Sequence, residues 1–253
     1  MTTVSALIVT HNQAPLLEDC LKSVSFVDEI VIVLDKCTDA SKSIAERYTK
    51  HIIEGAWELE GDRRNLGIQA CSSTWILEID TDERVSASLA VEIKSAIASC
   101  KTPAYFLIPF DNYIGNTLVK CGWGCSWGVG SAVRLFSKGA KIWGAQLVHP
   151  KLALHGEKKI LSHAITHYAF KDITDMIQKF NTYTSKRALD LMQQNVEDTL
   201  AHNIRRFFSR FYKCYCRRKG YKEGSYGLLN AIFAGLFPLV SFLKAKELMR
   251  RIP

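Results

Sequence analysis

Apolar and polar residues alternate along the first 110 residues in blocks that predict strands and helices in turn. Short apolar runs predict strands, and runs whose apolar residues recur every three to four positions predict helices. The expected strands cover residues 4–9, 29–34, 51–54, 75–79 and 105–110, and the expected helices cover residues 14–24, 39–48, 62–71 and 87–99. Strands that alternate with helices through short connections predict an α/β fold, with a parallel sheet covered by helices on both faces.

Polar residues follow three of these expected strands. They occupy positions 10–12, 35–39 and 80–82. Ligands of open parallel sheets bind at the carboxyl ends of the strands, and these three segments would lie along that one edge. The pattern therefore predicts a ligand site there.

The segment WILEIDTDER, residues 75–84, ends an apolar strand with Asp80 and Asp82. Mg²⁺ and Mn²⁺ prefer oxygen ligands and are commonly shared between one or two carboxylates and substrate phosphates. The pair is therefore expected to hold such an ion on a nucleotide diphosphate. The alternative is that Asp82 only caps the following helix. The sequence has neither a G-x-G-x-x-G nor a P-loop pattern, so a dinucleotide or Walker-type site is not expected.

Composition sets the class of protein but not its chemistry. The 253 residues are 47% hydrophobic and 23% charged, which is ordinary for a globular protein with one substantial α/β domain and an appendage. The N-terminus reads as a first strand and not as a signal peptide. The eight cysteines are accordingly expected to be reduced thiols, and their spacing matches no zinc site.

Charge is concentrated at the C-terminal end. The chain carries +8, but residues 203–253 alone hold twelve Lys/Arg and two acidic residues, which leaves the remainder at −2. The same segment contains the uncharged run 228–243, which is short for a membrane span. Basic flanks around an apolar run predict a helix that lies on an anionic membrane surface. A helix docked on the body is the alternative, and nucleic acid is not expected because it would not explain the apolar run. Two domains are predicted, residues 1–190 and 191–253.

Several segments together resemble a known family. ALIVTHNQAPLLEDCLKSV, EIVIVLDKCTDAS and DRRNLGIQACSSTWILEIDTDERV resemble the N-terminal half of the family 2 inverting glycosyltransferases, and GWGCSWGVGSAVRLFSKGAKIWGAQLVHP resembles the branch that acts on lipopolysaccharide core. The resemblance covers about residues 4–190. It implies a Rossmann-like GT-A fold with a mostly parallel central sheet, followed here by a helical basic and apolar extension.

The resemblance also implies roles for individual residues. The donor nucleotide would be bound by Thr10, Asn12, Asp35, Asp39, Arg64 (or its neighbour Arg63), Asn65 and Asp80. Asp80 and Asp82 would hold Mg²⁺ or Mn²⁺, which offsets the charge of the leaving diphosphate. The alternatives are that Asp39 caps the next helix and that the arginines lie on a solvated helix surface.

The catalytic base and the acceptor site are open. An inverting transfer needs a base for the attacking hydroxyl, but Pro150 stands where the family branch has a glutamate. His149 and Asp111 are the expected substitutes, and Glu157 is a more distant one. Trp123, Trp127 and Arg134 match the acceptor segment of the branch. The two tryptophans could form a sugar-stacking platform or belong to the core.

The expected protein is a cytoplasmic glycosyltransferase, peripheral on the inner face of the cytoplasmic membrane. It would move a hexose from a nucleotide-diphosphate sugar, with UDP-sugar favoured, to a lipid-linked saccharide such as lipopolysaccharide core. Two alternatives stay open. One is a polyprenyl-phosphate glycosyltransferase, whose ionised acceptor needs no base. The other is a non-catalytic protein that binds sugar nucleotides or glycans.

Overall fold

The computed structural model describes residues 2–146, 150–193 and 198–250. The chain forms two compact units. The first comprises Met1–Phe110 and Ser131–His167, and the second comprises Asp111–Gly130 and Tyr168–Pro253. Strands β6 (Ala104–Ile114) and β12 (Ile165–Phe170) continue from the first unit into the second. The boundary expected after residue 190 falls inside a helix of the second unit, so the two divisions differ.

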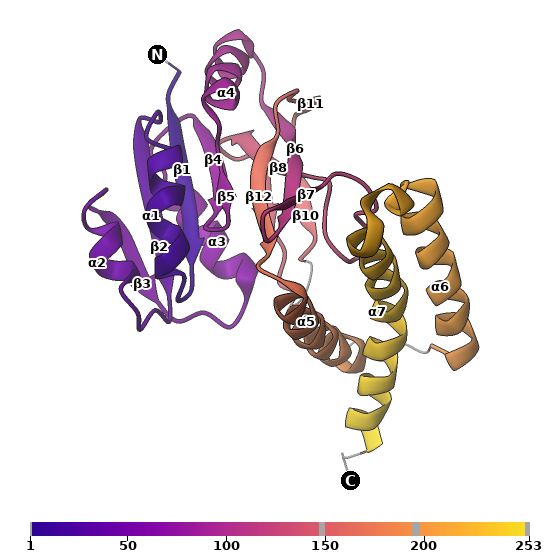
Figure 1. Cartoon of the computed structure of the whole chain (residues 1–253). Helices are drawn as coiled ribbons and strands as arrows, with labels where there is room; N and C mark the ends of the chain where they lie inside the picture. Colours follow the sequence, from indigo (N-terminus) through magenta and orange to yellow (C-terminus); the bar gives the residue numbers. More distant parts are fainter. Residues whose placement is uncertain (1, 147–149, 194–197, 251–253) are drawn as a thin grey trace. The chain divides into compact units, whose positions relative to one another are not determined.

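The first unit holds most of the sheet (Figure 1). Its other strands are β1 (Val4–Thr10), β2 (Glu29–Asp35), β3 (His51–Gly55), β4 (Trp75–Asp80), β5 (Glu83–Arg84), β8 (Ser131–Ser137), β9 (Lys141–Trp143), β10 (Leu152–Leu154) and β11 (Glu157–Ile160). Its helices are α1 (Ala14–Ser23), α2 (Ser41–Ala45), α3 (Glu60–Ala70) and α4 (Ala87–Ser99).

The strand order confirms a mostly parallel central sheet. Strands β3, β2, β1 and β4 lie side by side in parallel. Strand β8 then pairs antiparallel with both β4 and β6. The expected strand at 105–110 is therefore not a direct parallel neighbour of β4, because β8 lies between them. The antiparallel strand β8 comes from the later part of the chain, after the alternating strands and helices have ended.

Alternating side chains of the strands build two apolar layers. On one face, Ile8 and Leu77 pack with Leu17 of α1 and Ile93 of α4. On the other face, Leu7 and Ile76 pack with Ile68 of α3. Since successive side chains of a strand point to opposite faces, a sheet covered on both sides has strands that are apolar throughout. The predicted covering of both faces is confirmed.

The second unit is built around one long helix. It contains β7 (Thr117–Val119), α5 (Ile173–Gln193), α6 (Leu200–Tyr212), the π-helical turn η1 (Lys213–Arg217), the 3-10 helix η2 (Gly220–Glu223) and α7 (Gly224–Arg250). Both α5 and α6 pack against α7 (Figure 1). The apolar run 228–243 lies within α7, where Ala231, Ala234 and Phe237 are buried in the core. The helical segment Gly220–Arg250 is long and apolar enough to cross a membrane, but half of its most apolar window is buried inside the protein.

Candidate active site

The carboxyl ends of β1, β2 and β4 meet at one edge of the sheet. Thr10 pairs with Leu34, next to Asp35, and Asp80 pairs with Val9, next to Thr10. Three strand ends that were expected to converge from the sequence therefore do so. Thr10, Asp35 and Asp80, which end these strands, all belong to the first unit.

Asp80 is held between two arginines. Its Oδ1 accepts a hydrogen bond from Nη2 of Arg64 at 2.9 Å, and its Oδ2 accepts one from Nη2 of Arg134. Burial alone would raise the pKa of Asp80, but the two guanidinium groups hold that pKa well below its usual range. Asp80 is thus ionised and fixed in place. Because each of its oxygens faces a guanidinium cation, which repels a metal ion, Asp82 is the aspartate of the pair that is open to a metal ion.

Asp82, Glu83 and His167 form a cluster whose ligand atoms all lie within 4.8 Å of one another. Nε2 of His167 lies 3.7 Å from Oδ2 of Asp82. The antiparallel pairing of β5 with β12 sets His167 opposite Glu83 and brings the imidazole to this site. Sequence reasoning missed His167. The only signal was a histidine in the alternating strand ITHYAF, and that pattern gives no information about which strand it pairs with.

Two of the three residues in this cluster, Asp82 and His167, could bind a divalent cation. Glu83 is buried, and its two oxygens accept hydrogen bonds from the backbone N–H of Asp80 and from Arg134. Asp82 and His167 are both partly exposed. A carboxylate oxygen and an imidazole nitrogen suit Mn²⁺, and Mg²⁺ would rely more on the carboxylate. Burial would lower the pKa of His167, but the Asp82 carboxylate raises it above its ordinary value, so metal binding would displace a proton from this imidazole.

Asp35 is the last residue of β2, at the edge of the sheet where the nucleotide is expected to bind. Its Oδ1 accepts a hydrogen bond from the backbone N–H of Trp57 at 3.0 Å, and its Oδ2 accepts one from Arg63. Nearby, the Thr10 hydroxyl and Nε of Arg63 are buried and have no hydrogen-bond partner among the described residues. Buried polar atoms are normally satisfied, so these two are consistent with a ligand that completes the site.

Asn12 and Asp39 hold the loops around that edge. Asn12 adopts a φ of 51°, and its side-chain oxygen accepts a hydrogen bond from the Thr38 N–H at 2.7 Å. The carboxylate of Asp39 accepts hydrogen bonds from the N–H groups of Ala14 and Ser41. Both side chains therefore connect the segments that precede α1 and α2. Asp39 binds backbone N–H groups at the starts of these helices, as the capping alternative expected. The N-cap residue of α2 itself is Ala40.

The predicted roles of Arg64 and Asn65 at the diphosphate do not agree with the structure. Arg64 is buried and bonded to Glu60, Glu78 and Asp80. Asn65 exchanges two hydrogen bonds of 2.9 Å with the backbone of Trp143. Neither side chain is free to meet a phosphate, and Arg64 is not a solvated surface residue. Both were misjudged because the segment DRRNLG does not reveal that Arg64 will reach β4 and that Asn65 will reach β9.

Arg64 belongs to a buried ion network of six residues. We use this name for Arg64, Glu78, Asp80, Glu83, Arg134 and Lys141. Nζ of Lys141 donates to Glu78 at 2.7 Å and to the Val133 carbonyl at 2.8 Å. Burial lowers the pKa of Lys141 to about 8. The network explains the glutamate that interrupts the apolar strand 75–79, since Glu78 is fully buried and compensated by Lys141 and Arg64.

The expected acceptor residues lie elsewhere. Trp127 is 2% exposed and stacks on Phe170 in the core of the second unit, and Trp123 stacks on the same ring. Neither offers a free face to a sugar, so the core alternative is correct for both. Arg134 is buried in the ion network and is not available to an acceptor. The spacing of tryptophans on a loop cannot show which apolar surface will cover them.

The structure describes two of the three residues that were expected to act as the base, Asp111 and Glu157. His149 lies outside the described residues. Asp111 is a half-buried residue of β6 in the second unit. Glu157 pairs with Ala104 at the start of β6, about 20 Å along that strand from the Phe110 ring that contacts His167. This distance rules out Glu157 as the base.

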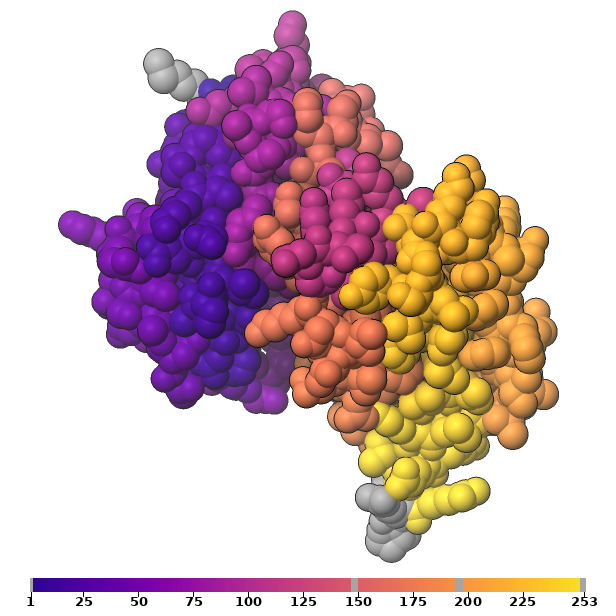
Figure 2. Space-filling view, in the orientation of Figure 1, coloured from indigo at the N-terminus to yellow at the C-terminus, as the bar shows by residue number. Residues whose placement is uncertain are grey.

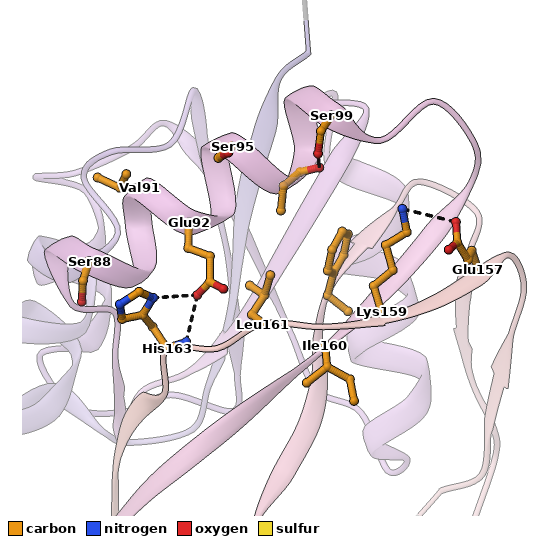
Figure 3. Close-up of a pocket in the computed structure, with 12 residues that line it drawn as sticks. Ser88, Val91, Glu92, Ser95, Ser99, Glu157, Lys159, Ile160, Leu161 and His163 are labelled. Carbon is orange, nitrogen blue, oxygen red and sulfur yellow. Dashed lines mark hydrogen bonds and ion pairs between the residues drawn. The ribbon is translucent and has the colours of Figure 1, made fainter.

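Glu157 instead lines a groove of about 740 Å³ between α4 and β11 (Figure 3). The carboxylate of Glu92 lies across one end of this groove, where it accepts hydrogen bonds from the Ser162 and His163 N–H groups and contacts the His163 ring at 2.8 Å. The groove runs along the beginning of β6. It is therefore separate from the edge at which the donor residues meet.

A GT-A sheet with an Asp-x-Asp pair at the end of β4 defines the class of nucleotide-sugar glycosyltransferases. Residues 5–94 match the family described as glycosyl transferase family 2. The resemblance found in the sequence is thus confirmed over residues 5–94, and the chain is a glycosyltransferase.

Relatives support this assignment over the whole chain. A protein of Rickettsia felis described as an uncharacterized glycosyltransferase is 24% identical, with 98% of this chain and 90% of the relative covered. The lipopolysaccharide core biosynthesis glycosyltransferase LpsC of Rhizobium meliloti is 26% identical over 105 residues, which is 38% of this chain and 37% of LpsC.

Among solved structures, S. aureus TarS 1-349 in complex with UDP-GlcNAc has a TM-score of 0.52 at 14% identity, with 97% of this chain and 89% of the TarS chain covered. Glucosyl-3-phosphoglycerate synthase from Mycobacterium tuberculosis in complex with phosphoglyceric acid has a TM-score of 0.50 at 13% identity, with 78% and 82% covered. At this identity the likeness shows the GT-A fold.

Proposed function

We propose that this chain is an inverting, metal-dependent glycosyltransferase that moves a hexose from a UDP-sugar to a lipid-linked saccharide such as lipopolysaccharide core. The observation that carries the donor half is the pair of Asp82 and His167 beside an Asp80 that two arginines hold ionised. The UDP-GlcNAc complex of TarS supports UDP as the nucleotide.

The first unit supplies the donor site. Asp35 and Thr10 would accept and donate hydrogen bonds to the nucleoside, and Arg63, beside Asp35, would meet a phosphate with its unpaired Nε. Asp82 and His167 would hold Mn²⁺ or Mg²⁺, which supplies positive charge to the diphosphate as the bond to the sugar breaks. Asp80 would position this edge through Arg64 and Arg134.

The acceptor hydroxyl attacks the anomeric carbon from the face opposite the diphosphate and loses its proton to a base. Asp111 and His149 are the proposed bases. Trp123, Trp127 and Arg134 have no part in acceptor binding.

The lipid-linked acceptor rests on the LpsC relative and on the basic and apolar C-terminal segment. We propose that residues 191–253 form the part of the chain that meets an anionic membrane surface, and that the enzyme acts at the cytoplasmic face. Pro150 favours a second candidate, transfer to a polyprenyl phosphate, because that acceptor is already ionised. Side-by-side assays with a saccharide and a polyprenyl-phosphate acceptor separate the two.

Calorimetric titration with UDP, GDP and ADP, each with and without Mn²⁺, tests the donor site. We expect Mn²⁺-dependent binding of UDP that Asp82→Ala abolishes. Asp19→Ala, on the exposed side of α1, is the matched control and should bind as the unaltered chain does. No binding of any nucleotide would sink the proposal. Tight Mn²⁺-dependent UDP binding without transfer to either acceptor type would indicate a non-catalytic binding protein.

A further inference from the structure

Only part of the apolar face of helix α6 is buried against α7. Phe207 packs against Gly235 of α7, and Asn203 and Cys214 are buried on the same side. Beyond this contact lies a row of exposed apolar side chains at intervals of four residues. They are Leu200, Ile204, Phe208 and Tyr212, with exposed fractions of 50%, 42%, 64% and 59%. We call these four residues the apolar stripe.

A row of cations runs beside the apolar stripe. Arg205 lies in α6, and Lys213 and Arg217 lie in the π-helical turn that continues it. All three are exposed. In the part of the chain that the structure describes, none of them has a carboxylate within ion-pair distance, whereas Arg206, on another side of the helix, pairs with Asp198 at 2.8 Å. We call Arg205, Lys213 and Arg217 the basic stripe.

Adjacent apolar and basic stripes on α6 and the turn η1 that continues it fit an anionic lipid surface. Residues spaced by four lie on one side of a helix, so the apolar stripe can enter the headgroup region while the basic stripe meets lipid phosphates. Contiguous exposed apolar surface often marks a site that contacts a protein partner or a membrane. Single-stranded nucleic acid also binds cations and aromatic rings, but Leu200 and Ile204 cannot stack on bases.

We propose that α6, together with the turn η1 that continues it, lies on an anionic membrane surface through the apolar and basic stripes. This inference deepens the proposed function, on which it rests for the lipid-borne acceptor. It differs from the expectation drawn from the sequence, which gave this role to the run 228–243. Much of the apolar surface of that run is buried in the core of the second unit, where it packs with α5 and α6. In Figure 2 the atoms of α6 are orange, and those of α7 change from gold to yellow along the helix.

Vesicle co-sedimentation of the full chain tests the proposal. The vesicles are phosphatidylglycerol with phosphatidylethanolamine, and phosphatidylcholine alone for comparison. We expect binding to the anionic vesicles that weakens with added salt. Ile204→Ser with Phe208→Ser should weaken that binding at least about tenfold, and Arg205→Glu with Lys213→Glu and Arg217→Glu should do the same.

Matched controls come from α5 in the same unit. Ile177→Ser removes a side chain that is 53% exposed, and Lys186→Glu reverses an exposed charge. Both should leave vesicle binding within about twofold, since neither belongs to a stripe. Leu243→Ser reports on α7 and should have as little effect.

Four outcomes would overturn the proposal. They are no binding of the unaltered chain to anionic vesicles, equal binding to phosphatidylcholine, unchanged binding of the α6 variants, and loss of binding in Leu243→Ser alone. Binding of a single-stranded oligonucleotide that displaces the vesicles would point to nucleic acid instead. Mn²⁺-dependent UDP binding by the same samples shows that the fold is intact, and it separates failure of the membrane surface from failure of the donor site.

Discussion

Nε2 of His167 lies 3.7 Å from Oδ2 of Asp82, across the antiparallel pair formed by β5 and β12. One residue comes from the Asp-x-Asp segment and the other from a strand near the end of the first unit. The ring of Phe110, 5.1 Å away, packs against the imidazole and limits its movement. The proposed metal site thus depends on the pairing of β5 with β12.

The first prediction concerns His167. His167→Ala should weaken Mn²⁺ binding in the presence of UDP by about tenfold to a hundredfold, because it removes the only imidazole of the cluster. Electron paramagnetic resonance titration of Mn²⁺ measures this directly. His163→Ala, at the groove beside α4, is the control and should bind Mn²⁺ normally. Equal Mn²⁺ affinity in the two variants would remove His167 from the site.

The second prediction concerns stability. Arg134→Met should lower the free energy of unfolding by about 3–5 kcal/mol, because it leaves the Asp80 and Glu83 carboxylates without their shared cation. Urea unfolding provides the measurement. Arg47→Met breaks an exposed ion pair with Glu18 and should cost less than about 1 kcal/mol. A loss for Arg134→Met as small as that for Arg47→Met would mean that the network is not buried in solution.

The third prediction concerns pH. Burial raises the pKa of Glu83 from 4.5 to about 7, since the opposing effect of Arg134 does not outweigh it. Between these two values the folded chain binds more protons than the unfolded chain, so stability should fall as the pH rises from about 4.5 to about 7. The raised pKa of His167 acts in the same direction near the upper end of this range.

Glu83→Gln should remove the part of this pH dependence that comes from Glu83, which is at most about 3 kcal/mol. Unfolding in urea at half-unit steps of pH, with EDTA present, would show a flatter profile for the variant. A profile for Glu83→Gln as steep as that of the unaltered chain would show that Glu83 keeps an ordinary pKa.

The fourth prediction concerns the base. Removing the proton acceptor should lower kcat about 10²- to 10⁴-fold and leave UDP binding unchanged. We expect this for Asp111→Asn or for His149→Ala, measured with a saccharide acceptor. Glu157→Gln, whose side chain lies at the other end of β6, should keep full kcat. If neither Asp111→Asn nor His149→Ala lowers kcat, transfer to an ionised phosphate acceptor becomes the better explanation.

The sequence predicted the parallel half of the sheet well. The expected strands at 4–9, 29–34 and 75–79 end within one residue of β1, β2 and β4. These strands are buried on both faces, so their apolar runs are unbroken and easily seen. The expected helix 39–48 was less accurate, because α2 covers only Ser41–Ala45 and the residues after it form turns.

The sequence could not predict which polar side chains would make their hydrogen bonds within the protein rather than to a ligand. Arg64 and Asn65 fit a binding motif, yet their hydrogen bonds go to Glu78, Asp80 and the backbone of Trp143. Trp127 is on a loop that folds back into the core. In each case the outcome depends on contacts between segments far apart in the chain, and no local pattern contains them.

The second unit takes in residues 111–130 as well as the chain from Tyr168 onward. Trp127 donates to Asn230 of α7 at 3.3 Å, and the tilted ring of Phe233 lies 5.2 Å from the Trp127 ring. A shortened protein that ends at residue 190 or 203 would therefore not be a clean catalytic domain, because it would expose this aromatic core to water. Such a truncation would aggregate for reasons unrelated to membranes, and single surface substitutions are the appropriate way to separate catalysis from targeting.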